Sequence, residues 1–132
     1  MSEANEIFFT VVGCMDGRVQ SPVVEFGRAK FGADYPDTIT EAGIVGLISN
    51  NPDSAFVENL KLKLIISIEK HHSKGIVVDG HQECAGNPVS DEKHKEDVIK
   101  SVEFVRSLTE DKVPVTGIFV VRRNNTWKAE EI

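Results

Sequence analysis

Short runs of apolar residues recur along the chain and predict four buried strands. Residues 6–13 are rich in β-branched and aromatic side chains and end at a glycine, which is typical of a buried strand. Residues 76–78 and 113–121 have the same apolar character, while residues 37–40 form a shorter and weaker candidate. The segments between these runs have a different periodicity, which indicates helices.

Three of these segments predict amphipathic helices. The first follows Pro22, a residue favoured in the first turn of a helix, and ends at Gly32. The second covers residues 53–72, where apolar side chains recur every four residues behind an Asp-Ser pair that can cap the helix. The third is capped by Ser90 and extends to about residue 108.

Two segments carry no pattern of regular structure. Residues 41–52 contain two glycines and the turn signal Asn-Asn-Pro-Asp begins at their end, so we expect turns there. The tail over residues 122–132 is polar apart from Trp127, and we predict no strand or helix in it. Trp127 is interpreted as a packing or oligomer contact rather than as a substrate platform.

The order of the elements predicts an α/β fold. Apolar strands that alternate with amphipathic helices are typical of a parallel sheet covered on both faces. We therefore expect three layers, with a central, mostly parallel sheet of about four strands and helices on both faces. The chain of 132 residues fits one domain, residues 1–132, and no internal repeat or linker divides it.

Charge and hydropathy narrow the classes of partner. The formal net charge of -6 argues against nucleic acid and against anionic membranes as partners. No apolar run approaches the roughly 18 residues that a membrane span requires. Residues 1–6 are polar and acidic, unlike a secretory signal, so a cytoplasmic location is expected.

The two cysteines of the chain each lie in a polar cluster that follows a predicted strand. Cys14 follows the first strand and precedes Asp16 and Arg18, while His81 and Cys84 follow the strand at residues 76–78. Ligands of open parallel sheets bind beyond the carboxyl ends of the strands, where both clusters fall. Two thiols, an imidazole and a carboxylate are donors that zinc prefers. This arrangement predicts one metal site.

Spacing suggests how the side chains of this site are oriented. If the chain stays extended, Cys14, Asp16 and Arg18 project to the same side, so that Arg18 can form a forked pair with Asp16. His81 and Cys84 are three residues apart, which suits two ligands on one turn. The cysteines could instead be buried and inert, or a redox pair, although neither cluster is a Cys-x-x-Cys motif.

The other histidines are given structural interpretations. His71 and His72 end the second helix, where an imidazole can meet free carbonyl groups or lie on the surface. His94 lies within a run of charged residues and is expected on a solvated helix face.

The combination Cys-x-Asp-x-Arg and Gly-His-x-x-Cys resembles the zinc signature of the β-class carbonic anhydrases. The resemblance covers about residues 6–121 and includes the order of the elements. It implies that Cys14, His81 and Cys84 bind Zn²⁺. It also implies that Asp16 either fills the fourth position of the metal, in a closed form, or pairs with Arg18 and leaves that position to water or hydroxide.

The resemblance also implies an activity and partners. The activity is the reversible hydration of carbon dioxide to bicarbonate by a zinc-bound hydroxide, with Asp16 and Arg18 as catalytic residues. The alternatives are hydrolysis of carbonyl sulfide or carbon disulfide at the same zinc site, and a non-catalytic zinc-binding module with a closed site. A homodimer or a higher homo-oligomer is implied as well.

The chain departs from the family pattern beside the predicted site. Where the family has a stretch similar to Arg-Asn-Ala-Gly-Asn, residues 40–44 read Thr-Glu-Ala-Gly-Ile and keep only Ala-Gly. The glutamine that the family often supplies to the substrate pocket has no clear counterpart, and Gln20 and Gln82 are the candidates to replace it.

Overall fold

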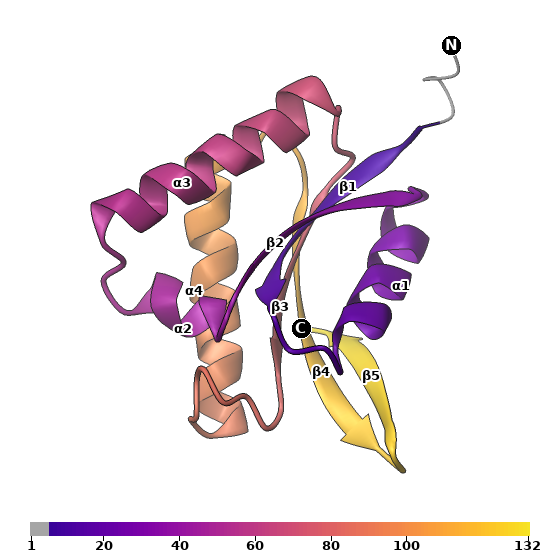
Figure 1. Cartoon of the computed structure of the whole chain (residues 1–132), viewed down its shortest axis with the longest axis vertical. Coiled ribbons are helices and arrows are strands. Elements are labelled where there is room, and N and C mark those ends of the chain that lie inside the picture. Colours follow the sequence, from indigo (N-terminus) through magenta and orange to yellow (C-terminus); the bar gives the residue numbers. More distant parts are fainter. Residues whose placement is uncertain (1–5) are drawn as a thin grey trace.

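A computed structural model describes residues 6–132, which contain one five-stranded sheet (Figure 1). Residues 1–5, most of the segment that argued against a secretory signal, lie outside the described residues. The order across the sheet is β2-β1-β3-β4-β5. The strands are β1 (Phe8–Cys14), β2 (Tyr35–Glu41), β3 (Ile76–His81), β4 (Val115–Arg123) and β5 (Thr126–Glu131). The first four run parallel, and β5 is antiparallel to β4.

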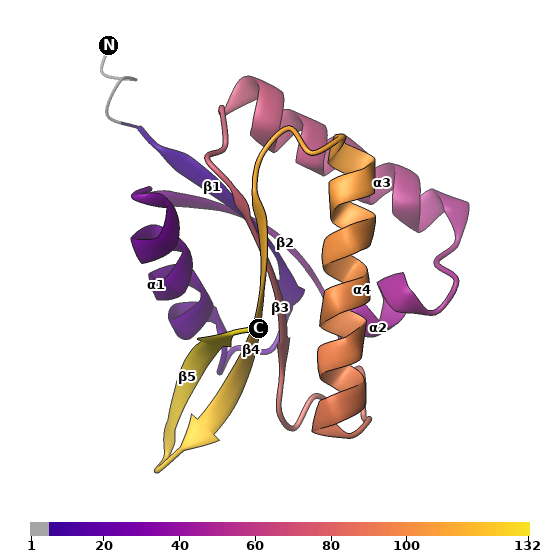
Figure 2. The same ribbon diagram turned by 180° about the vertical axis from the view of Figure 1, so that it is seen from behind.

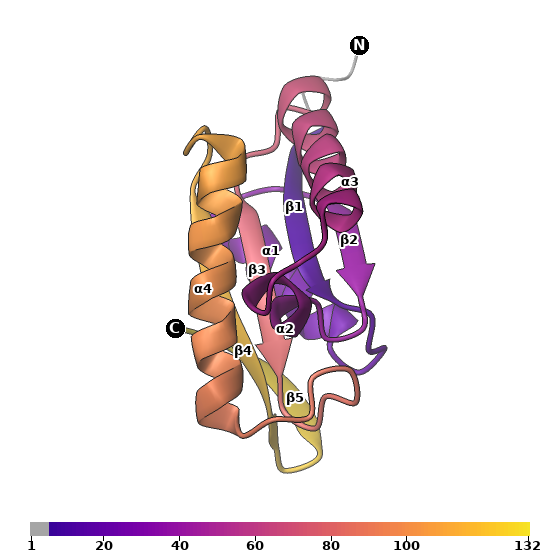
Figure 3. The same ribbon diagram turned by 90° about the vertical axis from the view of Figure 1, so that its left-hand side faces the viewer.

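Helices cover both faces of the sheet. They are α1 (Gln20–Phe31), α2 (Ile44–Ser49), α3 (Ser54–Ile65), the π-helical turn η2 (Ile66–Lys70) and α4 (Asp91–Thr109). Helix α1 lies on one face and α2, α3 and α4 lie on the other, as the view from behind shows (Figure 2). In Figure 3, where α2 and α3 face the viewer, α1 is behind the strands. The predicted three-layer α/β fold is confirmed.

The core has two halves because neighbouring strand residues point to opposite faces of the sheet. Val12 and Val78 pack against α2, α3 and α4, while Val11 and Val77 pack against α1. All four side chains are buried, and burying one valine side chain fully contributes about 1.5–3 kcal/mol. The near-continuous apolar runs of β1 and β3 are explained by this burial on both faces.

Side-chain caps begin two of the helices as the sequence predicts. The Asp53 carboxylate accepts a hydrogen bond from the backbone N–H of Phe56 at 2.9 Å, and Ser90 accepts one from Lys93 at 3.2 Å. The long helix predicted to residue 72 is instead α-helical to Ile65 and π-helical to Lys70. The helical segment ends at Lys70, two residues before the predicted end.

Two elements of the structure contradict the sequence predictions. Helix α2 forms within residues 41–52, where turns were expected, because one face of a six-residue apolar segment is buried against α4. Strand β5 forms within the polar tail and pairs with β4 through a turn at Asn124 and Asn125, both with positive φ. Asparagine tolerates this conformation in two-residue hairpin turns, which is the signal that could have revealed the hairpin.

Candidate metal centre

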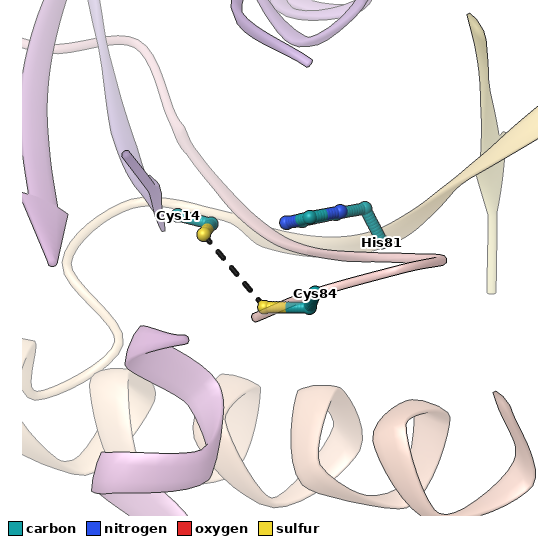
Figure 4. A group of neighbouring side chains, drawn as sticks. All are labelled: Cys14, His81 and Cys84. Carbon is teal, nitrogen blue, oxygen red and sulfur yellow. Dashed lines mark hydrogen bonds between the residues drawn. The ribbon is translucent and has the colours of Figure 1, made fainter. Parts of the chain in front are cut away.

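The side chains of Cys14, His81 and Cys84 converge at the carboxyl ends of two adjacent parallel strands (Figure 4). Cys14 ends β1, His81 ends β3, and Cys84 lies in the turn that follows. Their ligand atoms all lie within 4.8 Å of one another, and the two Sγ atoms are 3.8 Å apart. All three residues are buried. The grouping can therefore hold one metal ion.

A backbone hydrogen bond holds the imidazole of His81 in the tautomer that can bind a metal through Nε2. Its Nδ1 atom is 2.7 Å from the backbone oxygen of Gln82, a bond in which the ring donates its proton. The Nε2 atom is then the acceptor, and within residues 6–132 it is a buried polar atom with no hydrogen-bond partner. Leaving such an atom unsatisfied costs about 1–3 kcal/mol, and metal binding removes that cost.

The two thiols have pKa values shifted in opposite directions. Burial raises the pKa of the Cys14 thiol, but the nearby His81 ring and the backbone N–H groups of Gly43 and Asp16 outweigh burial and lower it to about 7. The Gly43 nitrogen lies 3.4 Å from the sulfur of Cys14. Burial and the charge of Cys14 raise the pKa of Cys84. Because metals bind the thiolate, binding must release the proton of Cys84.

The Ala-Gly pair at residues 42–43 forms part of the frame of the site. Gly43 has φ 60, and a Cβ atom placed on it would lie 2.4 Å from the carbonyl carbon of Gly86. This close approach packs the segment before α2 against the loop that carries Cys84. Asn87 of the same loop donates to the buried carboxylate of Asp97 on α4 at 3.0 Å. Contacts from α4 and from the segment before α2 therefore fix the position of the loop that carries Cys84.

A buried carboxyl group lies directly beside the cluster, and the sequence analysis missed it. Asp79 is 2% exposed and accepts a hydrogen bond from the backbone N–H of Cys14 at 3.2 Å. Burial raises its pKa to about 7, against the lowering influence of that hydrogen bond and of His81. Gly13 makes room for it, since a Cβ there would lie 1.9 Å from Oδ2 of Asp79. The available signal was an acidic residue within an apolar strand.

Asp16 and Arg18 form a forked ion pair, but not through an extended chain. Beyond Cys14 the backbone turns, and the backbone N–H of Val19 donates a hydrogen bond to the backbone oxygen of Asp16 at 3.2 Å. Arg18 donates from Nε and Nη2 to the two carboxylate oxygens of Asp16 at 3.1 and 2.7 Å. These bonds lower the pKa of Asp16 to about 2. Its Oδ2 atom is 4.0 Å from Nε2 of His81.

The prediction that His94 lies on a solvated face is wrong. Its ring is 3% exposed and packs edge-on against Phe119. Strand β3 has a glycine, Gly80, directly beneath it, and a Cβ there would approach the ring to 2.7 Å. The charged neighbours of His94 in the sequence obscured this inward position. His71 instead lies at the surface, as expected, where its ring stacks on Phe8.

Both glutamines considered for the substrate pocket are engaged in structural bonds. Gln20 donates to the backbone oxygens of Cys14 and Asp16 at 2.9 and 2.7 Å. Gln82 donates to Asp91 at 2.9 Å and accepts from the backbone N–H of Arg122 at 2.8 Å. The amide nitrogen of Gln20 and both ends of the Gln82 amide could bind a substrate only by breaking these bonds.

Comparison with known proteins identifies the family. A family model described as "Putative carbonic anhydrase" matches residues 4–132. The chain belongs to this family. Among curated proteins, none matches the chain at a significant level.

Solved β-carbonic anhydrases have the same fold. The carbonic anhydrase of Streptococcus mutans is 16% identical, with a TM-score of 0.62 over 97% of this chain and 82% of that one. Isoform I from Trichomonas vaginalis is 17% identical, with a TM-score of 0.58 over 95% and 82%. One of two tetrameric β-carbonic anhydrases from Sordaria macrospora is 13% identical, with a TM-score of 0.64 over 97% and 81%.

None of the helices in the described residues is long and apolar enough to cross a membrane.

Proposed function

We propose that this protein is a zinc-dependent carbonic anhydrase that converts carbon dioxide and water reversibly into bicarbonate and a proton. The observation that carries the proposal is the buried group of Cys14, His81 and Cys84, in which Nε2 of His81 has no hydrogen-bond partner among residues 6–132. An ionised carboxylate, Asp16, lies 4.0 Å from that nitrogen. Membership of the carbonic anhydrase family supports the same reaction.

The donor set favours zinc among the divalent metals. Two thiolates and one imidazole are soft and borderline donors, which suit Zn²⁺ better than the oxygen-binding ions Ca²⁺ and Mg²⁺. Cys14, His81 and Cys84 would hold the ion, and a zinc ion with a fourth position open to water would acidify that water and so supply a nucleophile at neutral pH. The two thiolates offset the charge of the ion, so the residues around it must contribute more to the reaction.

Asp16 and Arg18 are the residues proposed for this contribution. Asp16 stays ionised at neutral pH because Arg18 holds its pKa at about 2. In this form the carboxylate of Asp16 can only accept hydrogen bonds. By accepting a hydrogen bond from the nucleophile it would orient that nucleophile, so that one of its oxygen lone pairs faces the carbon of carbon dioxide. Through the forked pair, Arg18 binds both carboxylate oxygens of Asp16 and so competes with the metal for them.

The protein is also proposed to act as a homodimer or a higher homo-oligomer in the cytoplasm. Exposed apolar side chains support an oligomer, because Met15, next to Cys14, and Leu47 on α2 are 63% and 46% exposed. The Sordaria macrospora proteins with this fold are tetrameric. The net charge of -6 supports a small-molecule substrate rather than nucleic acid or an anionic membrane surface.

The test measures carbon dioxide hydration by stopped flow across about pH 7–9, with zinc content determined on the same sample. We expect a rate above buffer for the zinc-loaded protein. Asp16→Ala should keep zinc and lose most of the turnover, while Glu58→Ala, which removes an exposed carboxylate on α3, should change neither. A zinc-loaded protein without activity at any pH would overturn the proposal. Parallel assays with carbonyl sulfide and carbon disulfide test the hydrolase alternative.

A further inference from the structure

Arg18 divides its guanidinium group between two acidic residues. Its Nε and Nη2 atoms bind the carboxylate of Asp16, and its Nη1 atom donates to Oε1 of Glu83 at 3.1 Å. Nη2 also donates to the backbone oxygen of Glu83 at 3.1 Å. The orientation of Arg18 therefore depends on a residue that lies between His81 and Cys84 in the sequence.

Glu83 is itself held by a second arginine. Arg122, near the end of β4, donates from Nε to Oε2 and from Nη2 to Oε1 of Glu83, both at 3.0 Å. The backbone of Glu83 has φ 58, a conformation set by the tight turn between the two candidate ligands. The Glu83 carboxylate thus bridges Arg18 and Arg122.

Both arginines pack against an aromatic ring of the β4–β5 hairpin, that of Trp127. The guanidinium carbons of Arg18 and Arg122 lie 4.7 and 4.6 Å from the ring centre of Trp127 on β5. The Trp127 ring is half-buried against the core on the α1 side of the sheet, so its position is fixed by packing. Cation–π contacts of this kind favour one orientation of each guanidinium.

These contacts point to a positioning role rather than to a second anion site. Two guanidinium groups above an aromatic ring could attract an anion. Here, however, each one already binds a carboxylate: Arg18 binds Asp16 and Glu83, and Arg122 binds Glu83 in a forked pair. The cluster contains two positive and two negative groups, which leaves no excess charge for a further anion.

We propose that Glu83, Arg122 and Trp127 are positioning residues that hold Arg18, and through it keep the carboxylate of Asp16 off the metal. The inference rests on the proposed function of the Cys14, His81 and Cys84 group as a metal site. Without the Glu83 charge, Arg18 and Arg122 repel each other above one ring, and the grip of Arg18 on Asp16 weakens. Asp16 is then freer to take the fourth position of the metal.

The effect of Glu83 should be modest because the ion pairs are partly exposed. The side chains of Arg18, Glu83 and Arg122 are 41%, 50% and 40% exposed. Single pairs of this exposure typically contribute a factor of roughly two to five to an equilibrium. Glu83→Gln should therefore raise the ratio of closed to open sites by roughly two- to fivefold.

The test uses the full chain loaded with Co²⁺, whose visible spectrum reports the ligands of the metal. At one fixed pH, Glu83→Gln should shift the spectrum toward that of the carboxylate-bound form. The double variant Asp16→Asn with Glu83→Gln should have the same spectrum as Asp16→Asn alone, because no carboxylate remains at residue 16 to bind the metal. Glu69→Gln, which breaks an exposed ion pair with Lys112 far from the site, is the matched control.

Kinetics and a second variant complete the test. With zinc, Glu83→Gln should lower kcat/KM, because a smaller fraction of the sites is open to substrate. Trp127→Leu keeps apolar bulk but removes the aromatic face, and should shift the cobalt spectrum in the same direction. A Glu83→Gln spectrum identical to wild type, or a shift that persists with Asp16→Asn, would overturn the inference. A cobalt protein that responds as expected but hydrates no carbon dioxide would overturn only the proposed function.

Discussion

The carboxylate of Asp79 on β3 accepts a hydrogen bond from the backbone N–H of Cys14 at the end of β1, across 3.2 Å. This bond joins the two strands that carry the candidate metal ligands. It also places a fully buried acidic group beneath them. The position stabilises the geometry of the strand ends but gives the fold a group that is costly to ionise.

Asp79→Asn should stabilise the metal-free protein, and the gain should grow with pH. The folded pKa of Asp79 is raised to about 7 from 3.8. Between pH 3.8 and about 7, the Asp79 carboxyl is ionised in the unfolded wild-type chain but protonated in the folded one. The free energy of unfolding of the wild type therefore falls as pH rises through this range, and the contribution of Asp79 is constant above about pH 7. From pH 5 to pH 8 this amounts to at most about 3 kcal/mol. The asparagine oxygen can still accept the bond from Cys14.

Urea unfolding of chelator-treated protein at pH 5 and pH 8 measures this effect. The difference in unfolding free energy between Asp79→Asn and wild type should be larger at pH 8. Asp34→Asn, at an exposed position, should show no such change between the two pH values. Equal differences for Asp79→Asn at both pH values would contradict the buried ionisation.

Removal of the metal should lower the melting temperature. A ligand that binds only the folded state adds about 4 kcal/mol when its concentration exceeds Kd a thousandfold. Differential scanning calorimetry with zinc and then with a chelator measures the change. Cys84→Ser should lose most of it, since a hydroxyl is a poor replacement for a thiolate. A shift with Ca²⁺ as large as that with Zn²⁺ would speak against the sulfur and imidazole donors.

Gly43→Ala should damage the site more than Gly32→Ala, although both glycines have φ 60 and ψ 41. The left-handed backbone costs an alanine about 1–2 kcal/mol at either position. Only at Gly43 does the new Cβ also meet backbone atoms, those of Gly86 and Asn87 at 2.4–2.7 Å, while nothing lies within 4 Å at Gly32. Zinc affinity, measured by competition with a chromophoric chelator, should fall for Gly43→Ala and stay at the wild-type value for Gly32→Ala.

The sequence was sufficient to predict the four parallel strands and the grouping of the candidate ligands. Cys14 and His81 could be placed because parallel strands bring their carboxyl ends to one edge, a rule that depends only on topology. The forked pair of Asp16 and Arg18 was expected as well, but for the wrong reason. The two side chains meet because the backbone turns, with the N–H of Val19 donating to the backbone oxygen of Asp16. They do not meet because side chains alternate along an extended strand.

The residues that sequence reasoning missed depend on tertiary contacts. The strand β5 has too little apolar character to be found by periodicity, and its place follows from pairing with β4. Trp127 was expected as a packing contact, and it does pack against the core on the α1 side of the sheet. His94 lies among charged residues, yet it faces inward because Gly80 leaves space beneath it. The acidic side chain of Asp79 interrupts an apolar run, and only the glycine opposite, Gly13, accommodates it.

Asp97→Asn should weaken both the fold and the metal site. The Asp97 carboxylate is fully buried and accepts from Ser49 at 2.8 Å, from Asn87 at 3.0 Å and from Lys93. Burial raises its pKa, but these bonds outweigh burial and lower it. An asparagine turns one acceptor into a donor and leaves Lys93 without a charge partner. The loss should be about 2–4 kcal/mol at neutral pH.

The pH dependence separates this ionic role from simple packing. Because the folded pKa of Asp97 is lowered, its contribution is complete above the ordinary value of 3.8 and is lost as pH falls through the folded pKa. The penalty of Asp97→Asn in urea unfolding should therefore be constant near neutrality and shrink under acid conditions. Since Asn87 connects Asp97 to the loop that carries Cys84, zinc affinity should fall too. Glu69→Gln, at the exposed pair with Lys112, should cost at most about 1 kcal/mol and leave zinc binding intact.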